Sequence, residues 1–203
     1  MRPAPPSGSL DRKLQAKHGV IAGVDEVGRG ALAGPVTAAA VILDPRRPVA
    51  GLDDSKRLAP SRRAQLAEAI RERALAWAIA HRSPDVIDRI NILGATREAM
   101  TEAVQQLSPA PQLVVSDAVV LEGLRMPNRP EIRADARYLC VAAASILAKV
   151  ARDEIMVALA VEFPAYGWDA NKGYPTPWHL AALWRIGPSP LHRLSFGPVR
   201  VLA

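Results

Sequence analysis

The chain has little of what disulfide-bonded, membrane-spanning or aromatic-rich proteins contain. Its single cysteine, Cys140, excludes a disulfide framework within one chain and predicts a reducing, cytoplasmic location. No apolar run is long enough to cross a bilayer, so no membrane partner is expected. The first nine residues lack the apolar stretch of a secretory signal. Aromatic residues make up only 4% of the chain, which predicts a core packed from small aliphatic side chains.

The composition indicates one globular domain of ordinary size. The 203 residues are enough to bury a core, and 49% of them are hydrophobic. Lysine and arginine total 26 against 20 acidic residues, an excess that favours nucleic acid or another polyanion as partner. We expect residues 1–17 to form a flexible segment and residues 18–203 to form a single domain.

Apolar patterning predicts a hairpin followed by interleaved helices and strands. Residues 20–27 and 36–43 have the pattern of strands joined by a glycine-bearing turn. The elements expected after the hairpin are helix 59–73, strand 75–79, a short helix from 83, helix 92–107, strand 112–117, a short element at 132–135, helix 137–163 and helix 176–186. A proline-spaced tail follows. This order predicts a mixed α/β sheet with helices on both faces.

Two adjacent carboxylates, Asp25 and Glu26, lie inside the apolar strand 20–27. Ionised carboxylates in such a strand are costly to desolvate, and each raises the pKa of the other. A divalent cation removes this penalty. Because neighbouring side chains of a strand point to opposite faces, only one of the two can point directly at a given ion. The alternative interpretation is that Asp25 pairs with Arg29 while Glu26 faces solvent.

Two further carboxylates have settings that suit the same site. Asp117 ends a predicted strand, and Asp135 directly precedes a helix of small residues. Sites in open α/β sheets form at the carboxyl ends of strands. Four hard oxygen donors suit Mg²⁺ or Mn²⁺, and clustered carboxylates that hold two ions roughly 4 Å apart are typical of phosphodiester hydrolysis. Taken singly, Asp117 also fits a strand-end turn and Asp135 a helix N-cap.

The turn after the first strand carries Gly28-Arg29-Gly30. Two glycines let the backbone approach a ligand closely, and their N–H groups can bind phosphate oxygens. A dinucleotide-binding loop has similar glycine spacing but must open a helix. Here the loop runs into Pro35 and then a β-branched segment, which favours a strand and argues against that alternative.

Two other loops carry side chains suited to nucleic acid. Ser55 and Lys56 combine a hydroxyl and an ammonium, which suits a phosphate contact, although taken alone they are better explained by a solvated turn. Tyr174 lies in a glycine-bearing loop, where it could stack on a base or sugar or simply pack the loop.

Three further features have plain structural interpretations. His179, in the first turn of helix 176–186, and His192, in the tail, are interpreted as surface or capping residues. Lys149 and Asp153 are spaced i, i+4 and are interpreted as an ion pair on a helix surface.

The ordered set of these motifs resembles the bacterial ribonuclease HII family from about residue 20 onward. The opening motif is Gly23–Gly30 followed by Ala33-Gly34-Pro35. The matching positions after it are Asp54-Ser55-Lys56, Ser116-Asp117, Asp135, Ala142–Ile146, Ala148-Lys149-Val150, Arg152-Asp153, Lys172–Thr176, His179, His192-Arg193 and Ser195-Phe196.

The resemblance implies a ribonuclease H-like fold, a mixed five-stranded sheet flanked by helices with a helical C-terminal part. It also implies a monomeric endonuclease of RNA–DNA hybrids that nicks 5′ to single ribonucleotides in duplex DNA and leaves 5′-phosphates. By the same resemblance, Asp25, Glu26, Asp117 and Asp135 hold Mg²⁺ or Mn²⁺ and are catalytic. The residues that the resemblance assigns to substrate binding are Gly28, Arg29 and Gly30 at the 2′-OH, Ser55 and Lys56 at a phosphate, and Tyr174 at the following sugar.

The chain departs from the family pattern at two places. Ala118-Val119 stand where the family usually has glycine and asparagine, and Arg133-Ala134 stand where it usually has lysine and glycine. The carboxylates are retained, so the changes bear on the local turns and on any role of the missing asparagine.

Two alternative functions remain beside this one. A non-catalytic module that binds hybrids would share the basic charge, but it would not need four carboxylates that repel phosphate. A ribonuclease H that requires runs of ribonucleotides fits the same carboxylates, although Gly28–Gly30 together with Tyr174 favours recognition of a single ribonucleotide.

Overall fold

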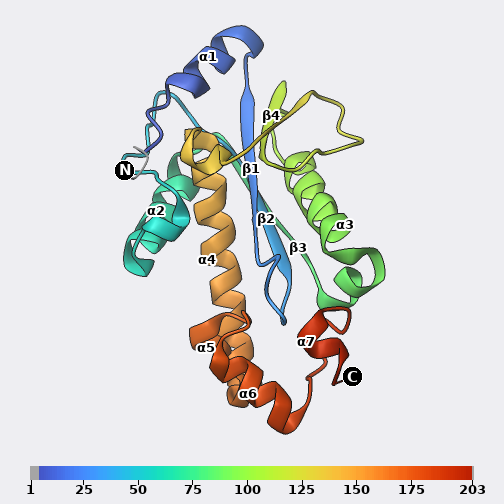
Figure 1. Ribbon diagram of the computed structural model, residues 1–203. Coiled ribbons are helices and arrows are strands. Elements are labelled where there is room, and N and C mark those ends of the chain that lie inside the picture. The colour runs from blue at the N-terminus through green and yellow to red at the C-terminus, as the bar shows by residue number, and fades with distance from the viewer. Residues whose placement is uncertain (1–4, 203) are drawn as a thin grey trace.

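A computed structural model describes residues 5–202, and these residues form a mixed sheet flanked by helices (Figure 1). The sheet has five strands in the order β3-β2-β1-β4-β5. The strands are β1 (Ile21–Val27), β2 (Val36–Ile42), β3 (Ala76–Arg82), β4 (Leu113–Asp117) and β5 (Asn128–Glu131). The pairs β1–β2 and β2–β3 are antiparallel, whereas β1–β4 and β4–β5 are parallel. The predicted fold class is confirmed.

Helices cover both faces of the sheet and extend beyond one end of it. They are α1 (Ser9–His18), α2 (Pro60–Arg73), α3 (Pro84–Gln105), α4 (Leu139–Glu162), α5 (Trp168–Asn171), α6 (Pro177–Ile186) and α7 (Gly197–Arg200). Short 3₁₀ turns cover Ser55–Arg57, Ala134–Ala136 and Pro164–Tyr166. Figure 1 shows α2 and α4 on one side of the sheet, α3 on the other, and α5, α6 and α7 beyond the end of β1 and β2.

The core is built from small side chains that alternate along the strands. Ala38 and Ala40 of β2 pack with α3, whereas Ala39 and Val41 pack with α2 and α4. Helix α4 approaches β1 so closely that a Cβ on Gly23 would lie 2.3 Å from the backbone carbon of Cys140. The absence of a side chain at Gly23 and the small residues of α4 permit this close approach.

Helix α1 corrects the prediction that residues 1–17 form a flexible segment. Residues 9–18 are helical, and Leu14 is buried against the core. The two oxygens of Asp11 accept hydrogen bonds of 3.0 Å from the N–H groups of Leu139 and Cys140. Asp11 thereby caps the N-terminus of α4, and α1 is part of the fold. Residues 1–4, also in the predicted segment, lie outside the described residues.

Several boundaries differ from the sequence-based expectations. The fifth strand is β5, and the expected element at 132–135 is instead a turn that leads into the 3₁₀ segment at Ala134. The two helices expected from 83 to 107 form α3 with a kink at Asn91. The loop after β1 leads into the antiparallel strand β2, so the dinucleotide-binding alternative is wrong. Across residues 5–202, no helix combines the length and apolar character needed to cross a bilayer.

Candidate active site

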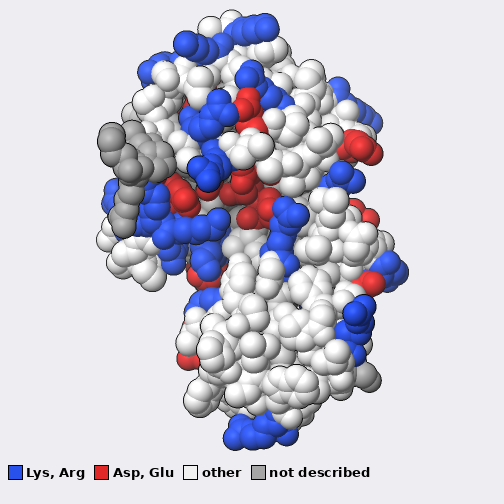
Figure 2. Space-filling model, in the orientation of Figure 1, with Lys and Arg blue, Asp and Glu red and all other residues white. Residues whose placement is uncertain are grey.

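The four predicted carboxylates meet at one end of the parallel strands β1 and β4. Asp25 and Glu26 lie near the end of β1, Asp117 ends β4, and Asp135 lies in the 3₁₀ turn before α4. They line a cavity of about 330 Å³. The other residues that line this cavity are Val27, Ser55, Lys56, Ser145, Lys149 and Tyr174. Figure 2 shows acidic side chains gathered in a hollow on this face, with basic side chains around it.

Asp25 is the most deeply placed of the four carboxylates, with a relative exposure of 5%. Its Oδ1 accepts a hydrogen bond of 2.8 Å from the backbone N–H of Glu26. Burial raises the pKa of Asp25 well above its ordinary value, and the charges of Glu26 and Asp117 add to the rise. A hydrogen bond from Ser145 offsets part of it. The site therefore opposes ionisation of Asp25 unless positive charge is supplied.

Glu26 has one oxygen paired and one oxygen free. Its Oε1 accepts a hydrogen bond of 3.2 Å from Nη1 of Arg29. Its Oε2 is buried and has no hydrogen-bond partner among residues 5–202. Burial raises the pKa of Glu26, and the charge of Arg29 lowers it in part. The interpretation in which Asp25 pairs with Arg29 and Glu26 faces solvent is therefore wrong.

Asp117 and Asp135 are held by backbone N–H groups of the same turn. Oδ1 of Asp117 accepts 2.8 Å from the N–H of Ala134, and Oδ1 of Asp135 accepts 2.9 Å from the N–H of Ala136. Burial raises the pKa of Asp135, and the charges of Asp117 and Asp54 raise it further. The first of these bonds joins the end of β4 to the turn that carries Asp135.

The donor set fits a hard divalent cation. All four side chains offer carboxylate oxygens, and the partnerless Oε2 of Glu26 is the kind of buried acceptor that a cation satisfies. Within residues 5–202, no three His, Cys, Asp or Glu side chains already converge as a complete set of ligands. The carboxylates that could hold the ion would have to be drawn together as it binds, and the positive charge of the ion would offset their mutual repulsion.

The glycine-bearing loop borders the carboxylates and has one closed and one open position. Gly28 has φ of +94°, and a Cβ there would lie 2.2 Å from Nε of Arg152. Glycine is therefore required at this position. Apart from its two chain neighbours, a Cβ on Gly30 would meet no atom of the described residues within 4 Å, so its backbone is open to an incoming ligand. Arg29, between them, has 44% of its side chain exposed.

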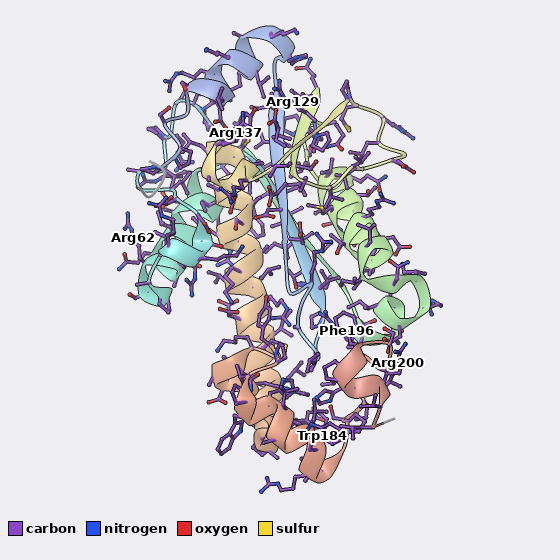
Figure 3. All side chains as sticks on the ribbon, in the orientation of Figure 1. Arg62, Arg129, Arg137, Trp184, Phe196 and Arg200 are labelled. Atoms are coloured by element: carbon purple, nitrogen blue, oxygen red, sulfur yellow. The ribbon has the colours of Figure 1, made fainter. Side chains whose placement is uncertain are left out.

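Two buried arginines fix this loop from beneath. Arg152 donates to the carbonyls of Pro35 (2.8 Å) and Lys172 (2.9 Å), so it joins the glycine loop to the loop of Tyr174. Arg193 donates to the carbonyl of Arg29 at 3.0 Å. Its guanidinium also lies 5.1 Å from the ring of Phe196, which Figure 3 shows beside α7.

Sequence reasoning gave these two arginines no role, because their partners are backbone carbonyls that no side-chain pattern reveals. Burial lowers the pKa of Arg193 to about 9, and the charge of Arg152 adds to the effect. Burying two guanidinium groups beneath the same loop, at the edge of this cavity, costs desolvation free energy.

The predicted phosphate-contacting residues differ in exposure. Ser55 is buried, and its Oγ lies 2.9 Å from Oγ of Ser145. Lys56 is exposed and lines the carboxylate cavity as well as an adjoining hollow, whose other residues include Arg57 and Arg133. Only Lys56 therefore presents its polar group openly to a phosphate.

Tyr174 borders the same cavity, next to two cations. Its ring centroid lies 6.0 Å from Nζ of Lys149 and 5.4 Å from Cζ of Arg152. The predicted ion pair between Lys149 and Asp153 is confirmed at 2.7 Å. The structure adds that Lys149 lines the cavity, which the sequence did not indicate.

The changed residues beside the carboxylates preserve the turns. Ala118 adopts a left-handed φ of 52°, the conformation that glycine favours, and its N–H donates 3.1 Å to the carbonyl of Glu131. Arg133 is also left-handed, with φ of 57°. The Glu131 side chain pairs with Arg129 and Arg137, which Figure 3 shows near the N-terminal end of α4.

Known proteins match this chain over nearly its whole length. The model of the ribonuclease HII family matches residues 22–199. A ribonuclease HII from Solibacter usitatus (strain Ellin6076) is 54% identical over 207 residues, which cover 98% of this chain and 90% of that relative.

Two solved structures share the fold. The ribonuclease H2 from Pyrococcus horikoshii OT3 aligns with a TM-score of 0.77 and 26% identity over 90% of this chain and 96% of that one. The ribonuclease HII from Archaeoglobus fulgidus, solved in complex with PCNA, aligns with a TM-score of 0.75 and 27% identity over 88% and 95%.

Proposed function

The chain belongs to the ribonuclease HII family and is a ribonuclease H endonuclease, and we propose that it needs divalent cations and nicks duplex DNA 5′ to a single embedded ribonucleotide. It would also hydrolyse the RNA strand of longer RNA–DNA hybrids. The observation that carries the metal requirement is the buried, partnerless Oε2 of Glu26 beside Asp25 and Asp117, whose charges oppose one another without a cation.

The proposed roles of the carboxylates follow from their places in the cavity. Asp25, Glu26, Asp117 and Asp135 would hold Mg²⁺ or Mn²⁺ and are the catalytic residues. When bound, the cations supply positive charge that lowers the pKa of the attacking water and offsets charge on the leaving 3′-oxygen. The backbone N–H groups of Glu26, Ala134 and Ala136 keep three of the carboxylates oriented toward the cavity.

The proposed substrate contacts surround this cavity. The open backbone at Gly30, in the loop Gly28–Gly30 with Arg29, would read the 2′-OH that distinguishes RNA from DNA. Lys56 would bind a backbone phosphate, with Ser55 supporting it from the buried side. Tyr174 would stack on the sugar that follows the ribonucleotide. These roles, a monomeric state and a cytoplasmic location remain predictions.

The experiment is cleavage of a labelled DNA duplex that carries one ribonucleotide, with Mg²⁺, with Mn²⁺ and with chelator. We expect a nick on the 5′ side of the ribonucleotide that requires the cation and leaves a 5′-phosphate. Equal cutting in chelator would overturn the metal requirement. Cutting of a long hybrid without any nick at the single ribonucleotide would favour the alternative enzyme that needs runs of ribonucleotides.

A further inference from the structure

Two histidines form a buried pair outside the carboxylate cavity. His179 of α6 and His192 of the following segment have relative exposures of 0% and 1%. Their Nε2 atoms lie 3.0 Å apart, a hydrogen-bond distance. The aromatic side chains of Tyr166 and Trp168 pack around them. The interpretation of these histidines as surface residues is therefore wrong.

The groups around the pair fix where its protons lie. The N–H of Ser189 donates to Nδ1 of His192 at 2.9 Å, so this nitrogen acts as an acceptor and carries no proton. Oγ of Ser189 also lies 2.9 Å from Nδ1 and can donate its hydroxyl proton to it. Neutral His192 is then protonated on Nε2 and donates to Nε2 of His179. Nε2 of His179 also accepts from Nε1 of Trp168 at 3.1 Å. His179 is therefore protonated on Nδ1, which donates 3.0 Å to the carbonyl of Tyr174.

This arrangement leaves no place for a further proton. Protonating Nδ1 of His192 would set it against the N–H of Ser189, and protonating Nε2 of His179 would set two N–H groups against each other. Burial lowers the pKa of His192 to about 4, and the neighbouring His179 adds to the effect. Burial lowers the pKa of His179 as well. Both histidines are therefore neutral at pH 7. His192 donates to His179, and His179 donates to the carbonyl of Tyr174.

The residue at the end of this chain of bonds borders the carboxylate cavity. The loop of Tyr174 is also tied to the glycine loop, because Leu32 donates its N–H to the carbonyl of Gly173 at 2.8 Å. The carbonyl of Lys172 is held by Arg152. The carbonyl of Tyr174 accepts from the backbone N–H of Thr176 at 2.8 Å, and His179 adds a side-chain donor to the same oxygen.

We propose that His179 and His192 are positioning residues that fix the backbone of Tyr174 and thereby set the preference for a single ribonucleotide over an uninterrupted hybrid. The inference rests on the proposed role of Tyr174. Neither histidine touches the reacting atoms, so the substitution of His179 should change the ratio between the two substrates more than the chemistry on the hybrid.

The test compares kcat/KM on a single-ribonucleotide duplex with kcat/KM on an RNA–DNA hybrid. We expect His179→Phe, which fills the space but removes the donor, to lower this ratio about fivefold, corresponding to about 1 kcal/mol. His179→Asn places an amide N–H near the position of Nδ1 and should restore the ratio to within about twofold. In a Tyr174→Ala background, His179→Phe should cause no further change.

Tyr166→Phe is the matched control, because it removes a hydrogen bond of 2.8 Å to the carbonyl of Gly187 in the same cluster without touching the Tyr174 peptide. For Tyr166→Phe, the ratio of the two kcat/KM values should equal that of the unmodified protein. If Tyr174→Ala lowers the ratio and His179→Phe does not, the inference alone fails. If Tyr174→Ala leaves the ratio unchanged, the proposed role of Tyr174 fails and the inference with it.

A second measurement does not depend on activity or on any variant. Imidazole ¹⁵N spectra of the unmodified protein at pH 7 should show His179 protonated on Nδ1 and His192 protonated on Nε2, both neutral. The opposite tautomers, or a charged ring in either residue, would overturn the proposal even if a variant failed to fold.

Discussion

The N–H of Ala134 donates a hydrogen bond of 2.8 Å to Oδ1 of Asp117, which ties the end of β4 to the turn that carries Asp135. Ala134 stands where the resemblance to the family leads us to expect glycine, yet the bond depends only on its backbone. The substitution therefore leaves the two carboxylates joined. The same site shows strain at Ala118, whose left-handed φ is not relieved by glycine.

Removing a single carboxylate should stop cleavage without removing substrate binding. Asp25→Asn takes away a charge that the proposed cations need, so we expect kcat to fall at least about 100-fold, whereas hybrid affinity changes by less than about threefold. Single-turnover cleavage and a binding titration measure the two effects. Asp44→Asn, a buried aspartate outside the cavity, is the control and should keep its activity. Full activity of Asp25→Asn would remove Asp25 from the catalytic set.

The stability of the metal-free protein should depend on pH through the raised pKa values of Asp25, Glu26 and Asp135. Above their ordinary pKa values the unfolded chain releases these protons more readily than the folded one, so stability falls as pH rises toward the folded pKa values. In chelator at pH 7, Asp25→Asn should therefore have a higher Tm than the unmodified protein.

Each kcal/mol relieved by Asp25→Asn should raise Tm by about 2–4 °C. Adding Mg²⁺ should reduce the difference in Tm between Asp25→Asn and the unmodified protein, because the cation offsets the repulsion only where Asp25 is ionised. Thermal unfolding at pH 7 and pH 4, with and without Mg²⁺, tests this. The difference between the two proteins should shrink at pH 4, and an equal difference at both pH values would contradict the argument.

Glycine at position 118 should stabilise the protein. A left-handed alanine costs about 1 kcal/mol relative to glycine, so Ala118→Gly should raise the free energy of unfolding by about that amount. Ala181→Gly serves as the matched control, because Ala181 is a solvent-exposed residue in the middle of α6. This substitution should lower the free energy of unfolding by about 1 kcal/mol. Denaturant unfolding of both variants tests the pair, and a loss of stability in Ala118→Gly would show that the turn is not strained.

The two glycines of the loop should respond differently to alanine. Gly28→Ala forces a Cβ against Arg152 at a left-handed position, so it should lower both Tm and activity. Gly30→Ala meets no protein atom, so its free energy of unfolding should change by less than about 0.5 kcal/mol.

If substrate approaches the backbone at Gly30, kcat/KM of Gly30→Ala on the ribonucleotide duplex should still fall about tenfold, which corresponds to about 1.4 kcal/mol. Cleavage kinetics and thermal unfolding of the same preparations separate the two effects. Unchanged kinetics of Gly30→Ala would remove the close approach from the proposed recognition.

Structural features that depend on neighbouring residues in the sequence could be predicted from the sequence. The strand around Asp25 is visible because apolar residues surround two charges, and Pro60 marks the start of α2. The ordered motifs also identified the family and therefore the fold. By contrast, β5 has the polar sequence Asn-Arg-Pro-Glu and no strand pattern, because its pairing with β4 rather than its side chains makes it a strand.

The sequence by itself determined the fold class, the four carboxylates and the family. Only the tertiary structure decided that Glu26 rather than Asp25 pairs with Arg29, that Asp11 caps α4, and that His179 bonds to the carbonyl of Tyr174. Each of these contacts depends on how the folded chain arranges groups, and the Asp11 bonds join a side chain to backbone groups 128 and 129 residues away in sequence. A local pattern reports burial and periodicity, but it carries no record of which backbone N–H or carbonyl the fold will bring within 3 Å.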